Sequence, residues 1–484
     1  MPPAVMALAV AIALPLLFYL PGLLISRAIP GATSADALER HYERVVISTL
    51  LSGWLALLLA EMGAFSRWLH LGLVVLVCLV CGALPAAHTS RTRHRQPGGR
   101  LEVLAFSLVG VIAVLLVIPP FEVVLGVRDA GVYANAGFAI ARTGSLVQHH
   151  DLLADLGQAA QSDDAAVREP AQQALTNFLG VQHPERFIAT RMQAAGFVIN
   201  EGEMVQGRVV PQGFHLFPAW VALLTSVAGF SAGLAAPGVM AVLGAWSVGM
   251  LGRRLAGSLV GLLAFLFLAL NGVQVWFGRY STAETTTQFL TFAGLYSFAR
   301  FQQADDDRQD PPAARIYYAA LAGVAFGQCA LTRLDSFLVI GPVVLYLLFC
   351  AVAHRWNAAH TALAVGLGAM LVHTGLHVLF IARAYFFDTA FARLQDYALT
   401  SHLALPFLTP TLREIYHGRP ESALKDPAQI WRELAVLAAG AGGLLVLWRW
   451  PGLLFQPDIA AGIPHLDALV LQNVDVSSDD AQLL

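Results

Sequence analysis

The stretch Gly126-Val-Arg-Asp-Ala-Gly-Val-Tyr-Ala-Asn-Ala-Gly137 follows a long apolar run and lies near the start of a polar loop over residues 121–212. It places a base, Arg128, beside an acid, Asp129, where a helix is expected to leave a membrane. Ionisable side chains at such a boundary are costly, so each is a functional candidate that needs a partner. The alternative is an interfacial charge pair that only ends a helix. The aromatic Tyr133 that follows favours a site.

The composition of the chain predicts its class. Of 484 residues, 57% are hydrophobic and 13% are charged, and the mean hydropathy is +0.63. A soluble domain covers its surface with more polar side chains than this chain has. Lipid offers no partner for backbone N–H and C=O groups, so crossing segments must be helical. We therefore predict an all-α integral membrane protein, and the net charge of −3 gives no reason to expect nucleic acid.

Apolar runs of spanning length recur along the chain and predict about eleven transmembrane helices. They cover residues 4–26, 45–64, 69–87, 101–120, 233–252, 255–275, 284–300, 316–332, 335–353, 358–382 and 430–448. The first run has no basic segment before it and is longer than a signal-peptide core, so we interpret it as a retained span. Three regions are expected: N-terminal helices over 1–100, a catalytic region over 101–450 and a polar tail over 451–484.

The arginines predict the orientation, since Lys425 is the only lysine among 29 basic residues. Four arginines lie between His88 and Arg100, and the positive-inside rule assigns such a short loop to the cytoplasm. The loop 121–212 is then extracytoplasmic. The next apolar run, Phe214 to Gly229, has only 16 residues and either crosses the membrane, or lies in or re-enters its outer interface. The arginine bias favours the second alternative, which makes Arg253-Arg254 cytoplasmic.

The large loop is predicted to begin with an amphipathic helix in the headgroup plane. Apolar residues recur at helical spacing from Gly131 to Leu146, with polar residues between them. The sequence Thr143-Gly144-Ser145 is typical of a helix C-terminus. The rest of the loop, 147–212, lacks a core of its own and is expected to be a lid or an insertion.

Three further polar clusters are predicted on the face that carries Asp129. The first joins Arg279 and Glu284, where the arginine can clamp a phosphate and the acid can hold a hydroxyl or orient that arginine. The alternative there is a salt bridge between two helices. The second cluster is Arg333 with Asp335, and the third is the loop from Tyr385 to about Gln429, just after Arg383 at the end of a span. Several arginines on one face indicate an anionic ligand such as a lipid-borne phosphate, although arginines that only snorkel to headgroups fit as well.

Histidines and cysteines give no prediction of a metal site. His373 and His377 are four residues apart on one predicted helix, but no third ligand accompanies them. The four cysteines all lie in apolar runs, where Cys behaves as a small hydrophobe. His215 is expected at the outer interface, where it can contact a ligand headgroup, and Trp220 is expected to anchor the chain in that interface.

In order and spacing, these motifs resemble those of the GT-C glycosyltransferases, most closely the branch of protein O-mannosyltransferases and bacterial aminoarabinose transferases. In that family an aspartate begins the first large extracytoplasmic loop, as Asp129 does here. A His/Pro-containing entry to a short apolar helix, a Gly-Arg-Arg span end, and an arginine with an acid five residues on follow in turn. Here these are His215 to Pro218, Gly252 to Arg254, and Arg279 to Glu284. The resemblance covers roughly residues 101–300.

The chain also departs from the family pattern. The entry motif is His-Leu-Phe-Pro rather than His-Pro-Pro, Glu284 replaces the commoner aspartate, and three spans precede the loop helix where the family usually has one. No Asp-x-Asp pair occurs near Asp129, which argues against the metal-dependent oligosaccharyltransferase branch.

The resemblance implies transfer of a hexosyl or pentosyl group, with inversion, from a polyprenyl-phosphate donor to a protein, glycan or lipid acceptor. Asp129 would be the general base on the acceptor hydroxyl and Glu284 a second catalytic carboxylate. Arginines such as Arg279 or Arg383 would stabilise the leaving phosphate without a metal or cofactor. The implied location is a bacterial inner membrane, with the active face extracytoplasmic. The expected substrate-binding residues are Arg128, Tyr133, His215, Arg279, Arg333, Asp335 and Arg383.

Two other classes of protein remain. A transporter or flippase of a lipid-linked sugar would use the same arginines as headgroup ligands and break no bond. Transporters commonly contain repeats and helices interrupted near mid-membrane, and neither is evident in the sequence. A purely structural membrane component would explain the composition but not the clustered acids and arginines.

Overall fold

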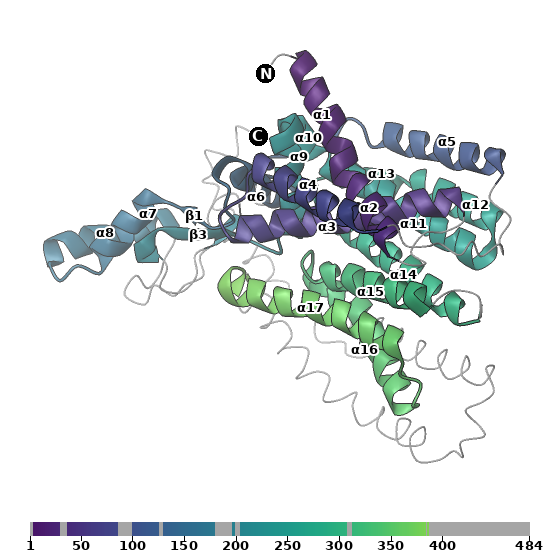
Figure 1. Ribbon diagram of the computed structural model, residues 1–484. Coiled ribbons are helices and arrows are strands. Elements are labelled where there is room, and N and C mark those ends of the chain that lie inside the picture. Colours follow the sequence, from purple (N-terminus) through teal and green to yellow (C-terminus); the bar gives the residue numbers. More distant parts are fainter. Residues whose placement is uncertain are drawn as a thin grey trace, which may run out of the picture. The chain divides into compact units, whose positions relative to one another are not determined.

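The computed structural model describes residues 3–29, 36–85, 99–124, 129–179, 196–198, 204–306, 312–383 and 385–386 (Figure 1). The chain divides into two compact units, Met1–Leu394 and Gln395–Leu484. All described residues belong to the first unit, in which helices from both sides of the predicted boundary at residue 100 share one core. The predicted span 430–448 and the tail 451–484 lie outside the described residues.

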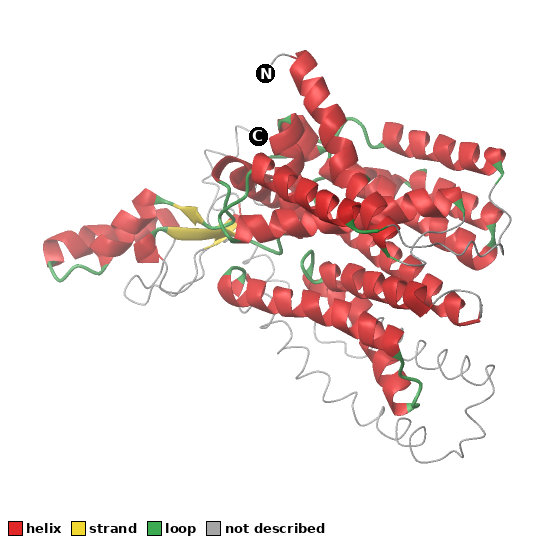
Figure 2. Cartoon of the chain, viewed as in Figure 1, coloured by secondary structure: helices red, strands yellow, loops and turns green. Residues whose placement is uncertain are grey.

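Helices dominate the described chain (Figure 2). They are α1 (Pro3–Phe18), α2 (Leu20–Ala28), α3 (Ala37–Glu61), α4 (Arg67–Ala83), α5 (Arg100–Leu116), α6 (Asp129–Thr143), α7 (Asp151–Ala160), α8 (Ala165–Leu179), α9 (Leu216–Ala228), α10 (Phe230–Leu234), α11 (Ala236–Ala256), α12 (Ser258–Ala269), α13 (Gly272–Arg279), α14 (Glu284–Asp306), α15 (Pro312–Cys329), α16 (Phe337–Val352) and α17 (Ala358–Phe380). Two short 3₁₀ helices are η3 (Met204–Gln206) and η4 (Leu334–Ser336). The described part of each span predicted up to residue 382 lies mainly on one or two of these helices.

The described residues form an integral membrane protein with fewer clear spans than predicted. Five helices are long and apolar enough to cross a bilayer, or six if α12 and α13 count as one bent span. The predicted span 255–275 is broken because the Asn271 side chain accepts hydrogen bonds from Val273 N and Gln274 N and starts a new helix, bent by 61°. Helices α4 and α5 have only 17 residues each. The prediction of about eleven spans is therefore supported only in part.

The predicted loop 121–212 contains regular structure of its own. The amphipathic helix is α6, and it ends as predicted at Gly144, whose φ of +77° is a conformation that glycine adopts readily. A small antiparallel sheet in the order β1-β3-β2 follows, formed by Gln148–His149, Arg208–Pro211 and Phe197–Val198. Its register pairs Gln148 with Val209. The sheet adds a few strand residues to a chain that is otherwise helical, as the predicted all-α class implies.

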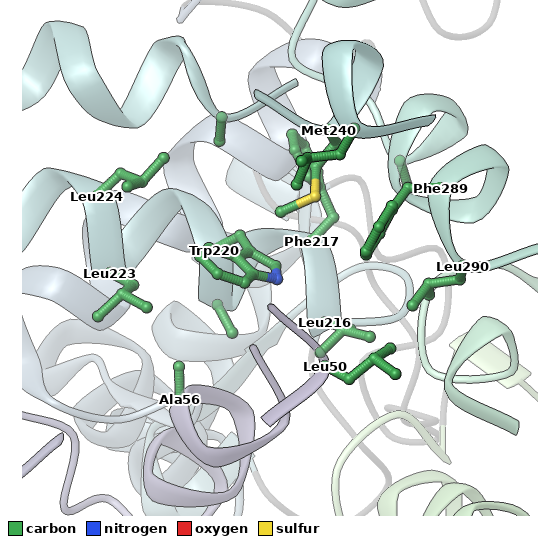
Figure 3. Packing of buried hydrophobic residues seen from close by; sticks show 14 of the residues in the cluster. Leu50, Ala56, Leu216, Phe217, Trp220, Leu223, Leu224, Met240, Phe289 and Leu290 are labelled. Atoms are coloured by element: carbon green, nitrogen blue, oxygen red, sulfur yellow. The ribbon is translucent and has the colours of Figure 1, made fainter. Parts of the chain in front are cut away.

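Helix α9 lies in the centre of the core. It covers most of the predicted run from Phe214 to Gly229, and its 13 residues extend about 20 Å, too short to cross a bilayer. Trp220 is 2% exposed and stacks on Phe18 with ring centroids 5.2 Å apart. Figure 3 shows it among apolar side chains that include Leu50. The expectation of an interfacial anchor at Trp220 was wrong, because α1, α3 and α6 enclose this helix.

Buried charges gather at one end of the helical bundle. The guanidinium of Arg253, at the end of α11, contacts three carboxylates: Asp36 at 2.8 Å, Glu39 at 3.2 Å and Glu102 at 2.6 Å. Arg300 of α14 also pairs with Glu39, at 3.8 Å. We call Asp36, Glu39, Glu102 and Arg253 the Arg253 cluster. It joins the first turns of α3 and α5 to the last turn of α11, and Arg300 links it to the second half of α14.

Candidate functional site

The candidate site lies around the first turn of α14, at the opposite end of that helix from Arg300. Five oxygen atoms there are buried and have no hydrogen-bond partner among the described residues: Ser281 Oγ, Thr282 Oγ1, Glu284 Oε2, Thr285 Oγ1 and Thr286 Oγ1. The four hydroxyl residues are each at most 2% exposed. Buried polar atoms are nearly always hydrogen-bonded, so such a group marks a place for water or a polar ligand.

Arg333 brings a cation to this turn. Its guanidinium binds Asp335 through two bonds, Nε to Oδ1 at 2.9 Å and Nη2 to Oδ2 at 3.0 Å, and it also pairs with Glu284 through Nη1. We call Glu284, Arg333 and Asp335 the Arg333 cluster. Its side chains are 32%, 29% and 46% exposed, respectively. The sequence predicted Arg333 with Asp335 and Arg279 with Glu284, whereas the structure joins Arg333 to both acids.

Two contacts hold the surrounding elements together. Thr287 Oγ1 lies 3.0 Å from Thr332 Oγ1, which links α14 to the turn before η4. Leu216 N donates to Leu331 O at 3.0 Å, which links the same turn to the start of α9. The Arg333 cluster is therefore placed by three elements that are far apart in the sequence.

Helix α6 supplies the predicted acid. Asp129 is the first residue of α6 and is exposed, and its carboxylate stands at the helix terminus that favours negative charge. One turn later, Tyr133 packs edge-on against Phe217, with ring centroids 5.7 Å apart. Burial raises the pKa of Tyr133; Tyr385, Asp129 and Glu284 raise it further, whereas the cation of Arg333 lowers it. Tyr133 is therefore a neutral hydroxyl that lies within the electrostatic reach of both Asp129 and the Arg333 cluster.

The other predicted arginines lie apart from the Arg333 cluster or outside the described residues. Arg279 donates from Nε to Pro119 O at 2.7 Å and stacks over Phe121 at 4.3 Å, so it ties α13 to the segment after α5. In the described part of the chain, no ion pair joins Arg279 to Glu284, so the alternative of a salt bridge between them is absent there. Arg383 follows α17 and is exposed. Arg128 falls outside the described residues.

His215 differs from its predicted position at a ligand-facing interface. It is 0% exposed, and both ring nitrogens are engaged, Nε2 with Pro211 O and Nδ1 with His377 Nε2, each at 2.9 Å. Burial, with the neighbouring His377, lowers the pKa of His215 to about 3, so the ring is neutral. Because both ring nitrogens are engaged, His215 has no free nitrogen with which to contact a lipid headgroup.

His215 belongs to a buried chain of polar groups that the sequence did not reveal. His377 Nδ1 lies 2.6 Å from Glu61 Oε1, and Glu61 Oε2 lies 2.7 Å from His373 Nε2. Trp54 Nε1 donates to His373 Nδ1 at 3.0 Å. We call His215, His377, Glu61 and His373 the histidine chain. A signal for it was present, because Glu61 and the histidine pair both stand near the ends of spans predicted to reach the same face.

The two ends of the histidine chain determine where its protons lie. An indole N–H can only donate, so His373 accepts at Nδ1 and donates from Nε2 to Glu61. A carbonyl can only accept, so His215 donates from Nε2 and, being neutral, accepts at Nδ1 from His377. One more proton lies between His377 and Glu61. The chain as a whole is therefore neutral, and it joins α3, α17 and the start of α9.

The chemistry available at the first turn of α14 is that of polyhydroxyl recognition. Carboxylates, one guanidinium and several unpartnered hydroxyls can accept and donate hydrogen bonds to sugar hydroxyls. Two acids share Arg333, so the described cluster has no excess of positive charge for an anion. Among the described residues, no group of three or more His, Cys, Asp or Glu side chains has a metal-binding arrangement.

Comparison with known proteins gives little beyond this description. No protein-family model and no curated protein sequence matches the chain. A crystal structure of the Archaeoglobus fulgidus oligosaccharyltransferase in the apo form is similar over 69% of this chain, with 16% sequence identity and a TM-score of 0.33. The chain spans 39% of the length of that structure. No activity or substrate follows from a likeness at that score. The described residues form a helical integral membrane protein with a hydroxyl-lined, carboxylate-bearing site at one end of α14.

Proposed function

We propose that this protein is a membrane glycosyltransferase that moves a sugar from a polyprenyl-phosphate donor to an acceptor hydroxyl. The observation that carries the proposal is the group of buried, unpartnered oxygen atoms at the first turn of α14, beside Arg333 and near Tyr133. A sugar presents several hydroxyls that both donate and accept hydrogen bonds, which matches the mixed donors and acceptors of this turn.

In this proposal Asp129 takes the proton of the acceptor hydroxyl as it attacks the anomeric carbon of the sugar. The bond from that carbon to the donor phosphate breaks, and the phosphate leaves with the bonding electrons on its lipid. Glu284 and Asp335 hold Arg333 in a fixed orientation. Arg279 and Arg383, whose predicted partner is the phosphate, offer guanidinium groups outside the Arg333 cluster and can offset the developing charge.

The orientation in the membrane is part of the proposal. Arg253, Arg254 and Arg300 all lie at the end of the bundle opposite Glu284. Since basic residues favour the cytoplasmic side, this arrangement supports an extracytoplasmic position for Asp129 and the Arg333 cluster.

The direct test is Asp129→Asn in protein reconstituted into liposomes with a labelled polyprenyl-phosphate sugar. General-base catalysis contributes about 10²- to 10⁴-fold, so we expect transfer to fall by at least about 100-fold. Asp151→Asn is the matched control, because Asp151 is also an exposed acid at the first position of a helix. Transfer that is unchanged in folded Asp129→Asn protein would reject the assigned role.

The same liposomes separate transfer from transport. A flippase would move the labelled donor to the other leaflet and leave its sugar–phosphate bond intact. We expect free polyprenyl phosphate to accumulate in step with the glycosylated acceptor. Donor movement without bond cleavage would favour the transporter.

A further inference from the structure

A second polar pocket, separate from the candidate site, lies between α4, α6 and α9. Its volume is about 560 Å³, and it is lined in part by Arg67, Arg142 and Ser226. Arg142 is thirteen residues along α6 from Asp129, which is about 20 Å on a helix. The pocket is therefore distant from Asp129, and none of its lining residues belongs to the Arg333 cluster.

The charge of this pocket is opposite in character to that of the candidate site. Arg67 and Arg142 both line it, and none of its described lining residues is acidic. Arg67 is held in place, because its Nη1 donates to Ser226 O at 3.1 Å and its guanidinium stacks over Trp68 at 4.9 Å. Arg142 is exposed and has no ion-pair partner in the part of the chain that the structure describes. Two guanidinium groups without a carboxylate between them favour a bound anion.

The walls of the pocket indicate where that anion comes from. Phe65, Trp68 and Phe138 line it beside the arginines. Trp68 is 70% exposed at the start of the apolar helix α4, a position typical of tryptophan at the level of lipid headgroups. A free phosphate would interact only with the two arginines, whereas a lipid would also contact the aromatic side chains that line the pocket.

We propose that this pocket binds the phosphate of an anionic lipid headgroup. Arg67 and Arg142 contact the phosphate oxygens, and the aromatic side chains contact the glycerol and the upper acyl chains. The site is independent of the proposed transferase activity, since none of its residues belongs to the Arg333 cluster or the histidine chain.

The test is binding of phosphatidylglycerol to the full-length protein in neutral detergent, measured by native mass spectrometry. A hydrogen bond to a charged group contributes enough that its loss weakens binding about tenfold or more. We therefore expect Arg67→Gln with Arg142→Gln to weaken the tightest bound lipid at least about tenfold. Arg27→Gln is the matched control, because Arg27 is an exposed arginine at the end of an apolar helix. It should leave that affinity unchanged.

Two further arms decide the source of the anion and guard against misfolding. Inorganic phosphate at the same concentration is expected neither to bind detectably nor to displace the lipid. Displacement by phosphate, lost in the double variant, would overturn the lipid assignment. Arg142→Gln alone changes an exposed side chain and should fold, and it is expected to weaken the lipid by a few fold. Wild-type affinity in Arg142→Gln, or an equal loss in Arg27→Gln, would overturn the site.

Discussion

The Arg253 and Arg333 clusters use the same chemistry for different purposes. Each has one guanidinium shared among carboxylates, and each ties together helices that are distant in the sequence. In the Arg253 cluster the arginine is 2% exposed and Asp36 is 4% exposed, whereas Arg333 is 29% exposed. Unpartnered hydroxyls border the second cluster.

An arginine surrounded by acids does not by itself mark a functional site. Burying a charge is costly unless it is paired, so a closed cluster holds helices together and has no room for a ligand. An open cluster bordered by unsatisfied polar atoms can exchange partners with a substrate. The exposure of the arginine and the presence of unpartnered polar atoms distinguish an open cluster from a closed one.

The largest expected effect is on stability, from Arg253→Met. This change removes the shared cation from the buried Asp36 and Glu39 and the partly buried Glu102, and breaking a buried pair costs about 3–5 kcal/mol. The variant should lose most of its folded yield in detergent, measured by size-exclusion chromatography, and should unfold at a markedly lower temperature. A variant as stable as the wild type would remove the structural role of this cluster.

The next effect separates activity from stability at the other cluster. Arg333→Gln removes a partly exposed cation, and ion pairs in such positions contribute about 0–1 kcal/mol. The melting temperature should change little, while sugar transfer should fall about 100-fold, the typical loss when one electrostatic contact in an active site is removed. Arg254→Gln, which changes an arginine near the Arg253 cluster, is the control for transfer. If Arg333→Gln lost stability as Arg253→Met does, the two clusters would be alike.

The smallest effect concerns pH and the histidine chain. The pKa of His215 is lowered to about 3 in the fold, from an ordinary value of 6.5. As the pH is lowered, His215 is protonated in the unfolded chain before it is protonated in the fold. The stability that the neutral His215 contributes is therefore present above pH 6.5 and is lost as the pH falls toward 3. The melting temperature of the wild type should therefore fall as the pH is lowered from 6.5 toward 3. His215→Gln should be less stable at neutral pH but show a shallower decline, and parallel curves would contradict the buried neutral ring.

Part of the candidate site was predictable. Asp129 and Tyr133 follow an apolar run, and Arg333 with Asp335 interrupts two others, so local pattern alone indicated them. The pairing of Glu284 with Arg333 was not predictable, since residues 49 positions apart can meet only through the packing of α14 against α15. The burial of His215 and its contact with His377 depend on tertiary packing in the same way.

The sequence by itself determined that this chain enters a membrane and is mainly helical, because burial in lipid demands apolar length and internal hydrogen bonds, and both are local properties. It also predicted the end of α6 at Thr143-Gly144, although α6 begins at Asp129 rather than at Gly131. Tertiary packing made the short run after Phe214 a core helix and brought Glu61 into contact with two histidines. It also buried the Arg253 cluster and left the Arg333 cluster partly exposed. Those outcomes depend on which side chains approach from distant segments, and that information is not local.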